Sequence, residues 1–231
     1  MPRTARASAG GYCYHVLNRG NARAKVFRKP QDYKAFVALI GEAGLRVPMR
    51  LIAYCLMPNH FHLALWPRED HDLSRWMQWL MTTHVHRYLA HYHRTGHVWQ
   101  GRFRAFPIEE DDHLRVVLRY IERNALRASL VERAEQWPWS SLCPDGEKPP
   151  LDPGPAPRGA GWVETVNAPM TEAEGEAIRT SIRRNRPLGT EPWVRTTAEK
   201  LGLQSSLRAP GRPRGTTETK EIQPRSLRIR L

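Results

Sequence analysis

Two apolar runs on either side of a Pro-Asn pair place the strongest constraint on how this chain folds. Residues 49–57 and 61–66 are both rich in apolar side chains, and Pro58-Asn59 lies between them. Proline and asparagine are turn residues, so the pair would bring the second run back antiparallel to the first. The sequence therefore predicts a β-hairpin.

The flanking segments alternate between strand and helix patterns. Residues 12–17 are aromatic and β-branched and run into a polar turn, as strands do. Helical spacing of apolar residues predicts helices at 31–43, 73–92 and 111–126, and residues 99–108 have the character of a further strand. The order is strand, helix, strand, strand, helix, strand, helix. It is typical of an α+β fold, a ferredoxin-like antiparallel sheet with packed helices, here with one extra helix.

The composition changes after the last of these helices. Prolines and glycines crowd residues 143–161, a further helix is expected from Thr171 to Asn185, with a capping box at Thr171 and Glu174, and basic residues dominate 208–230. We expect a main domain at 1–145, a Pro/Gly-rich linker at 146–170, and a helix with a basic C-terminal extension at 171–231 that orders on binding.

The charge of the chain points to a polyanionic partner. Lys and Arg number 36 against 23 Asp and Glu, which gives a formal net charge of +13. Nucleic acid fits this charge best. An anionic membrane is less favoured, and no apolar run approaches the roughly 20 residues that span a bilayer. The N-terminus lacks the apolar stretch of a secretory signal, and the three cysteines fit reduced thiols, so we expect a cytoplasmic protein.

His60 and His62 are candidate metal ligands. They begin the second hairpin strand, where residues two apart project from the same face, while Phe61 points into the core. Two similar pairs, His84/His86 and His91/His93, fall on the predicted 73–92 helix or its end. Residues two apart on a helix diverge by roughly 200°, so these pairs cannot share a metal.

The predicted helix 111–126 carries a second candidate group. Tyr120, Asn124 and Arg127 follow one face beside its apolar stripe. The helix pattern alone favours Tyr120 as a core-edge aromatic with its hydroxyl in water. Cutting a phosphodiester needs an oxygen nucleophile and a cation on the non-bridging oxygens, and a tyrosine with two histidines and an amide can supply both. These donors leave positions open on Mg²⁺ or Mn²⁺.

Several motifs, taken in order, resemble those of a known family. They are Tyr14-His15-Val16 with Asn18-Arg19-Gly20-Asn21, Met57-Pro58-Asn59-His60-Phe61-His62-Leu63, Trp99-Gln100-Gly101-Arg102-Phe103, Tyr120-Ile121-Glu122-Arg123-Asn124 and Glu135-Gln136-Trp137-Pro138-Trp139-Ser140-Ser141. Together they resemble the REP-associated tyrosine transposases, relatives of the single-tyrosine transposases of insertion sequences. One departure is Ala125, where the family usually has proline.

The resemblance implies a fold, a chemistry and roles for residues. It implies the HUH single-tyrosine transposase fold for the main domain, with His60, His62 and Asn124 as metal ligands and Tyr120 as the nucleophile. It implies cleavage of single-stranded DNA beside a hairpin, leaving a 5′-phosphotyrosine and a free 3′-hydroxyl. It also favours a monomer, although related transposases are dimers.

Contacts to DNA are expected from basic and aromatic residues near these motifs. The candidates are His15, Arg19, Trp99, Arg102, Arg104, Arg123 and Arg127, with Arg212 and Arg214 in the basic tail. A core role for Trp99 and a merely solubilising tail are the alternatives.

Three other functions stay open. A descendant that only binds hairpin DNA or RNA would have no use for the histidines and the tyrosine. A nuclease that uses water would keep the histidines and tolerate loss of Tyr120. A structural zinc protein would need a fourth ligand, which the sequence does not suggest near His60 and His62.

Overall fold

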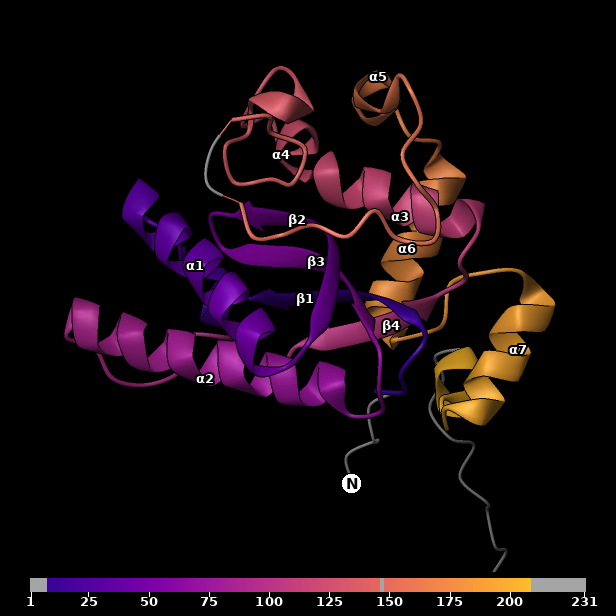
Figure 1. Ribbon diagram of the computed structural model, residues 1–231, viewed down its shortest axis with the longest axis horizontal. Coiled ribbons are helices and arrows are strands. Elements are labelled where there is room, and N and C mark those ends of the chain that lie inside the picture. Colours follow the sequence, from indigo (N-terminus) through magenta and orange to yellow (C-terminus); the bar gives the residue numbers. More distant parts are fainter. Residues whose placement is uncertain (1–7, 146–147, 209–231) are drawn as a thin grey trace, which may run out of the picture.

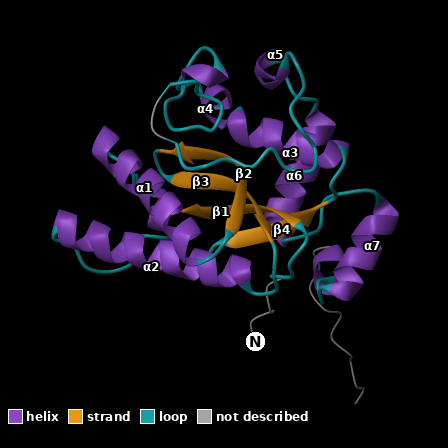
Figure 2. Cartoon of the chain, in the orientation of Figure 1, coloured by secondary structure: helices purple, strands orange, loops and turns teal. Residues whose placement is uncertain are grey.

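Four antiparallel strands form the sheet at the centre of the molecule. The computed structural model describes residues 8–145 and 148–208. The strands lie in the order β2-β3-β1-β4 (Figure 1, Figure 2). Their bounds are Cys13–Arg19 for β1, Met49–Met57 for β2, His60–Pro67 for β3 and Arg104–Ile108 for β4. This order and the antiparallel pairing confirm the ferredoxin-like α+β fold expected from the sequence.

The predicted hairpin is present. Strands β2 and β3 pair from Met57 opposite His60 to Met49 opposite Pro67, so Pro58 and Asn59 make the turn. Strand β1 then pairs with β3 on the other side, with Arg19 opposite His60. The start of β3 therefore lies beside the end of β1, at one end of these two central strands.

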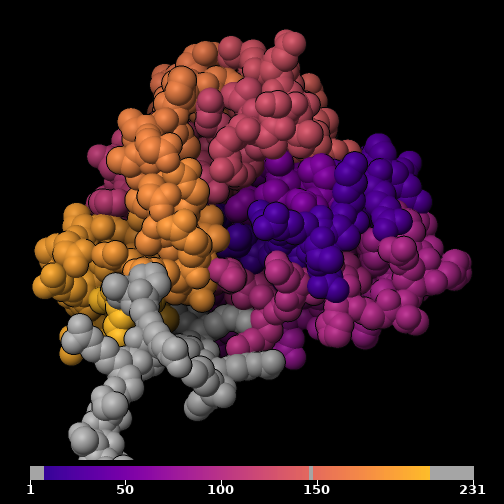
Figure 3. All heavy atoms as spheres, turned by 180° about the vertical axis from the view of Figure 1, so that it is seen from behind, coloured from indigo at the N-terminus to yellow at the C-terminus, as the bar shows by residue number. Residues whose placement is uncertain are grey.

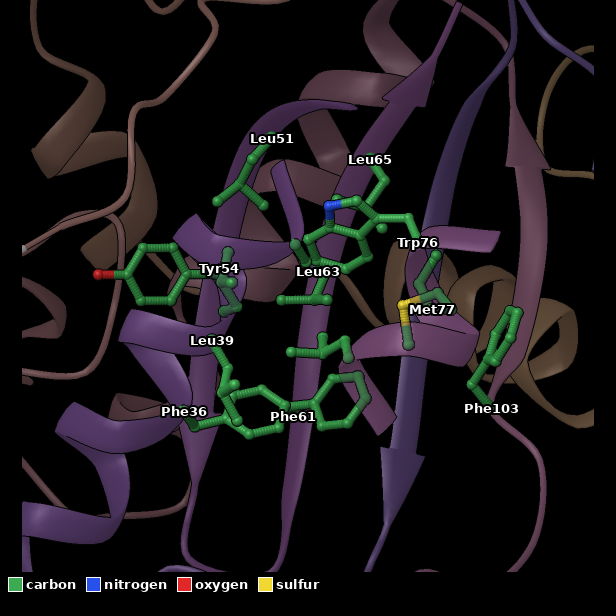
Figure 4. Close-up of a cluster of buried hydrophobic side chains, with 14 of the residues drawn as sticks. Phe36, Leu39, Leu51, Tyr54, Phe61, Leu63, Leu65, Trp76, Met77 and Phe103 are labelled. Carbon is green, nitrogen blue, oxygen red and sulfur yellow. The ribbon is translucent and has the colours of Figure 1, made fainter. Parts of the chain in front are cut away.

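Helices α1 (Pro30–Arg46) and α2 (Asp72–Tyr92) cover one face of the sheet (Figure 1). The Asp32 carboxylate fixes the start of α1, because it accepts hydrogen bonds from the backbone N–H groups of Arg28 and Lys29. Between these helices and the sheet lies an apolar core, part of which Figure 4 shows around Phe36, Phe61 and Trp76. Both helices match their predictions and extend them slightly.

The other face of the sheet carries α3 (Asp112–Glu122) and α4 (Asn124–Arg127), which replace the single helix predicted at 111–126. The helix is interrupted at Arg123. The Asn124 side chain donates to the carbonyls of Tyr120, at 2.8 Å, and Ile121, at 3.3 Å. Because the side-chain amide takes the carbonyl of the residue four positions earlier, it competes with the helical backbone bond and breaks the regular helix.

The strand predicted at 99–108 is shorter than expected, since only Arg104–Ile108 pairs with β1. Before it, Trp99 makes an isolated bridge to Gly20, and the chain turns at Gly101, whose φ is 140°. A side chain at Gly101 would be strained in that conformation. Residues 100–103 therefore form a loop at the same edge of the sheet as His60.

The C-terminal part adds α5 (Trp162–Asn167), α6 (Glu172–Arg184) and α7 (Glu191–Lys200). Among the described residues, 3₁₀ turns lie at Asn21–Arg23, Ala134–Gln136 and Gln204–Leu207. The predicted capping box of α6 is confirmed, with Thr171 Oγ1 accepting from the Glu174 N–H at 3.2 Å. Helix α7 was not predicted, although Thr190 and the proline two residues later are a helix-start signal.

Residues 148–161 run along the main domain. The Asp152 N–H donates to the Leu51 carbonyl at 2.7 Å, and Arg158 donates to the Ile52 carbonyl at 2.7 Å. Figure 3 shows the C-terminal residues, orange to yellow, gathered on one side of the molecule, with the N-terminal part, indigo to purple, on the other. The expected boundaries, with the main domain ending at residue 145 and the linker at residue 170, stay predictions. Among the residues that the structure describes, no helix is long and apolar enough to cross a bilayer.

Candidate active site

His60 and His62 project from β3 toward α3. Their ring centroids are 5.0 Å apart, and the His62 ring is 5.8 Å from the ring of Tyr120. Phe61, between them, is fully buried on the opposite face, where it packs against Phe36. The structure thus brings together the two histidines and the tyrosine that the sequence singled out, although they lie about 60 residues apart in the chain.

Hydrogen bonds to neighbouring side chains engage Nδ1 of both His60 and His62. His60 Nδ1 lies 2.6 Å from Asn59 Oδ1. Because an amide oxygen only accepts, His60 Nδ1 carries the proton and Nε2 keeps its lone pair. His62 Nδ1 lies 2.8 Å from His15 Nε2. When His62 is the donor in that pair, its Nε2 also has a lone pair available for a metal.

His15 is the buried partner of His62. It lies on β1 with no exposed surface, and its ring is stacked on the His62 ring with centroids 5.0 Å apart. Burial lowers the pKa of His15 to about 3, so its ring is neutral at physiological pH. Its Nδ1 is buried without a hydrogen-bond partner among the described residues. The sequence suggested a DNA contact for His15; the structure shows all of the ring enclosed by protein.

Two arginines add positive charge to the site. Burial, together with the charges of Arg19 and Arg127, lowers the pKa of His60 to about 4. The pKa of His62 lies well below its usual range for the same reasons, with His15 and His60 contributing. Both imidazoles are therefore neutral near pH 7, which is the form that binds metals.

Tyr120, Asn124 and Arg127 form one group at the end of α3, as their spacing predicted. The Arg127 guanidinium lies over the Tyr120 ring, 4.8 Å from its centroid, and donates to Asn124 Oδ1 at 2.7 Å. Asn124 Oδ1 is the atom that a metal would need, so here the arginine holds it instead. Tyr120 and Asn124 are both buried, with 5% and 1% of their surface exposed.

The remaining arginines expected to contact DNA fall into three groups. Arg19 and Arg102 are exposed. Arg104 donates to the carbonyls of Ile182 and Arg183 at the end of α6, and Arg123 donates to those of Val166, at 2.8 Å, and Asn167 at the end of α5. Arg212 and Arg214 lie outside the described residues.

Trp99 occupies a position in the core. Its surface is 4% exposed, its ring packs against Phe61, and its Nε1 donates to His84 Nδ1 at 3.3 Å. This is the core role that the sequence also allowed. His84 is buried by the same contact, and His91 binds Lys29, with 2.8 Å between Nε2 and Nζ. His84 and His91 of α2 thus have protein partners of their own.

A buried carboxylate, which the sequence did not single out, holds the tyrosine helix in place. Glu122 is 1% exposed. Its oxygens accept hydrogen bonds from Ser141 Oγ at 2.7 Å, Trp162 Nε1 at 2.6 Å and the Arg158 guanidinium at 3.2 Å. The sequence contained a signal for this role, because Glu122 lies four residues after Leu118, on the apolar face of the helix, where a charged residue is unusual.

A cluster of Glu109, Asp111 and His113 also has ligand atoms within 4.8 Å of one another. It lies at the start of α3, at the opposite end from Tyr120. His113 Nδ1 is 2.9 Å from Asp111 Oδ1, and Glu109 accepts from the Thr190 N–H at 2.6 Å. These partners account for the cluster without a metal.

Comparison with known proteins defines the class of this fold and site. Residues 9–124, half of the chain, match the model of the IS200-like transposase family. The chain belongs to that family.

Within the family, the resemblance to REP-associated tyrosine transposases is confirmed. One protein described in those words, from Haemophilus influenzae, is 29% identical over 106 residues, which cover 41% of this chain and 60% of that protein. Another, from Escherichia coli K12, is 24% identical over 136 residues, 58% of this chain and 77% of that protein. The solved structure of a REP-associated tyrosine transposase bound to a REP hairpin superposes with a TM-score of 0.50 at 21% identity, covering 67% of this chain and 97% of that one. This likeness shows the fold.

Proposed function

We propose that the chain is an endonuclease and strand transferase that acts on single-stranded DNA at hairpin-forming repetitive palindromes through a 5′-phosphotyrosine. The single observation that carries the proposal is the placement of the Tyr120 ring 5.8 Å from His62 and beneath the Arg127 guanidinium. The proposed nucleophile, the candidate metal ligands and a cation that could bind phosphate thus lie together. Membership of the transposase family supports the same conclusion.

The chemistry would be an exchange of phosphodiester bonds. Tyr120 Oη bonds to the phosphorus, the bond from phosphorus to the 3′-oxygen breaks, and the departing 3′-oxygen takes up a proton as the phenol loses one. In the reverse direction a DNA 3′-hydroxyl attacks the phosphotyrosine and releases the tyrosine. One ester replaces another in each direction, so joining needs no external energy source.

A divalent metal, Mg²⁺ or Mn²⁺, fits the donors at this site. His60 and His62 would hold it through Nε2, and Asn124 would add its Oδ1 once Arg127 releases that oxygen. Bound there, the metal would neutralise the non-bridging phosphate oxygens. Arg127 is placed to follow the phosphate, because a guanidinium pairs with phosphate through two parallel hydrogen bonds.

The proposed partner is single-stranded and hairpin DNA. A related protein of the same fold has been solved with a REP hairpin. Exposed Arg19 and Arg102 lie at the edge of the sheet where β3 begins, and we propose that they bind phosphates. Contacts from His15, Trp99, Arg104 and Arg123 would require these side chains to leave their present partners. We propose a monomer that works in the cytoplasm near the nucleoid.

The test is a denaturing gel of the full chain incubated with labelled single strands that contain hairpins from its own genomic neighbourhood, with Mn²⁺ or Mg²⁺. We expect a protein–DNA adduct on the 5′-phosphate side that disappears in Tyr120→Phe and in His60→Ala. Tyr12→Phe is the matched control and should leave the adduct intact, since this tyrosine lies beside Trp193, just before the start of β1, whereas the other end of β1 pairs with His60.

Other results would select another function. Cleavage that survives Tyr120→Phe would indicate a nuclease that uses water. Tight hairpin binding without cleavage in either metal would indicate a protein that only binds DNA.

A further inference from the structure

The candidate active site is assembled from two separate parts of the fold. Strand β3 carries His60 and His62, whereas α3 carries Tyr120, whose ring lies 5.8 Å from that of His62. A nucleophile must be placed accurately, because a misplacement of about 1 Å can slow a reaction about 100-fold. The contacts that fix α3 against the sheet therefore bear on the reaction.

Residues 139–141 are attached to the sheet beside the edge strand β2. The Leu56 N–H donates to the Trp139 carbonyl at 2.9 Å, and the Ser141 N–H donates to the Tyr54 carbonyl at 2.9 Å. Strand β2 in turn pairs with β3. These backbone bonds fix Ser141 relative to the hairpin that carries the histidines.

The hydroxyl of Ser141 extends this attachment to α3. Ser141 Oγ accepts from the Tyr54 N–H at 3.1 Å, and it lies 2.7 Å from Glu122 Oε1 and 3.2 Å from the Tyr54 carbonyl oxygen. A hydroxyl has one proton to donate, and the shorter contact, to a carboxylate, is the stronger bond. A chain of hydrogen bonds therefore runs from the Tyr54 N–H through Ser141 to Glu122.

A second attachment reaches the same carboxylate from the C-terminal part. The Arg158 guanidinium donates to the Ile52 carbonyl at 2.7 Å and to Glu122 Oε1 at 3.2 Å, so it also joins β2 to α3. Trp162 Nε1 donates to Glu122 Oε2 at 2.6 Å. Because a buried polar network whose members are satisfied is rigid, the end of α3 is held in one position.

Glu122 occupies a point in α3 that governs where Tyr120 and Asn124 lie. It is the last residue of α3, and the helix is interrupted at Arg123, directly after it. Tyr120 lies two residues before it and Asn124 two residues after it. Residues two apart on a helix diverge by roughly 200°, so bonds at Glu122 hold the side of the helix away from Tyr120. They resist a rotation that would turn the phenol away from His62.

We propose that Glu122 is a positioning residue, which is tied to β2 through Ser141 and Arg158 and sets the placement of Tyr120 against His62. The inference rests on the proposed function, because Tyr120 is the nucleophile proposed there. It gives the C-terminal part of the chain a share in the cleavage step. Arg158, which lies beyond the residues that match the family, acts on the tyrosine through Glu122.

The first measurement needs neither DNA nor a metal. In the full chain, isotope-labelled at histidine, the NMR signals of the His62 imidazole are assigned by their loss in His62→Gln and report on the Tyr120 ring beside it. We expect Ser141→Ala to shift them, because the link to β2 is cut. Ser140→Ala is the matched control, since it removes a neighbouring buried hydroxyl that accepts from the Leu142 N–H at 3.2 Å.

The second measurement separates the rate of adduct formation from DNA binding. At saturating hairpin DNA with Mn²⁺, we expect Glu122→Met to slow the adduct about 100-fold and Ser141→Ala to slow it about tenfold. Fluorescence anisotropy in EDTA should give the wild-type affinity for the same DNA. Glu122→Gln keeps an oxygen that can accept from Ser141 and should recover part of the rate. Leu39→Ala creates a cavity in the core on the other face of the sheet and should leave the rate unchanged while the chain stays folded.

Two results would overturn the inference. One is an equal response of the His62 signals to Ser141→Ala and Ser140→Ala, and the other is a rate in Glu122→Met no lower than that in Leu39→Ala. If Glu122→Met does not fold, the rate in Ser141→Ala against that in Ser140→Ala decides. A wild-type chain that forms no adduct contradicts the proposed function alone, because the NMR comparison still decides whether these contacts position Tyr120.

Discussion

The two faces of the sheet are built from the same strands but differ in role: one packs in the apolar core, and the other carries the candidate catalytic groups. Along β3, Phe61, Leu63 and Leu65 point toward α1 and α2 and are fully buried in an apolar core. On the other side of the same strand, His60 and His62 face α3 beside Tyr120. Because side chains alternate along a strand, a single segment supplies both the core that stabilises the fold and the polar groups proposed for catalysis.

The largest expected contrast is between two adjacent residues of β3. Phe61→Ala removes a fully buried ring from the α1/α2 core and should lower the free energy of unfolding by about 3–5 kcal/mol. His60→Ala, one residue away, should change it by less than about 1 kcal/mol and abolish the DNA adduct. Urea unfolding of both variants measures the difference, and equal destabilisation would contradict the division between the two faces.

Glu122 refines the comparison between the two faces, because it is a polar group on the α3 side of the sheet whose expected role is to stabilise the fold. Arg158→Met should lower the free energy of unfolding by about 1–3 kcal/mol, because the buried carboxylate loses a charged partner and keeps only Ser141 and Trp162. Arg195→Met breaks an exposed pair with Glu191 and is the control, with an expected change below about 1 kcal/mol. Thermal or urea unfolding measures both, and similar losses would show that burial of Glu122 adds nothing.

The pairing of His15 with His62 predicts an effect on metal affinity. His15→Phe keeps a ring at this position but removes the nitrogen 2.8 Å from His62 Nδ1, so Mn²⁺ should bind about 10- to 100-fold more weakly. His15→Gln, whose amide can still accept a hydrogen bond, should restore part of the affinity. Isothermal titration with Mn²⁺ measures this directly; unchanged affinity in His15→Phe would mean that His15 only fills space.

A further expected effect is a dependence of stability on pH. Burial lowers the pKa of His60 to about 4 and that of His15 to about 3, against about 6.5 in the unfolded chain. The unfolded state thus binds more protons below pH 6.5, so stability is full above that pH and falls as the pH drops toward 4. Thermal melts should show a falling midpoint over this interval, and His60→Gln should make the fall shallower.

Much of the fold followed from periodicity within short segments. The hairpin, the two helices over the core, and the face shared by His60 and His62 each depend on residues a few positions apart, where spacing alone decides which side chains lie together. The group of Tyr120, Asn124 and Arg127 was found for the same reason. Their placement against His62 required the resemblance to known transposases in addition.

What the sequence could not show depends on contacts between distant segments. His15 meets His62 because β1 pairs with β3 in a register that puts Leu17 opposite His62, which makes His15 its diagonal neighbour. Glu122 finds partners 19 and 40 residues further along, at Ser141 and Trp162. No local pattern encodes such pairs. The break in the helix at Arg123 was not predicted either. The spacing of apolar residues gives no indication that the Asn124 side chain donates a hydrogen bond to the Tyr120 carbonyl.

The contacts of Glu122 have a consequence for how a chain of this kind can change over evolution. The family match ends at residue 124, yet the carboxylate buried in α3 finds two of its partners at Arg158 and Trp162. A deletion of the C-terminal segment would remove the Arg158 and Trp162 partners of that carboxylate and leave it with Ser141 alone, unless Glu122 were replaced in the same lineage. Descendants that shed the extension should therefore carry a neutral residue at this position, and descendants that keep the glutamate should keep the extension.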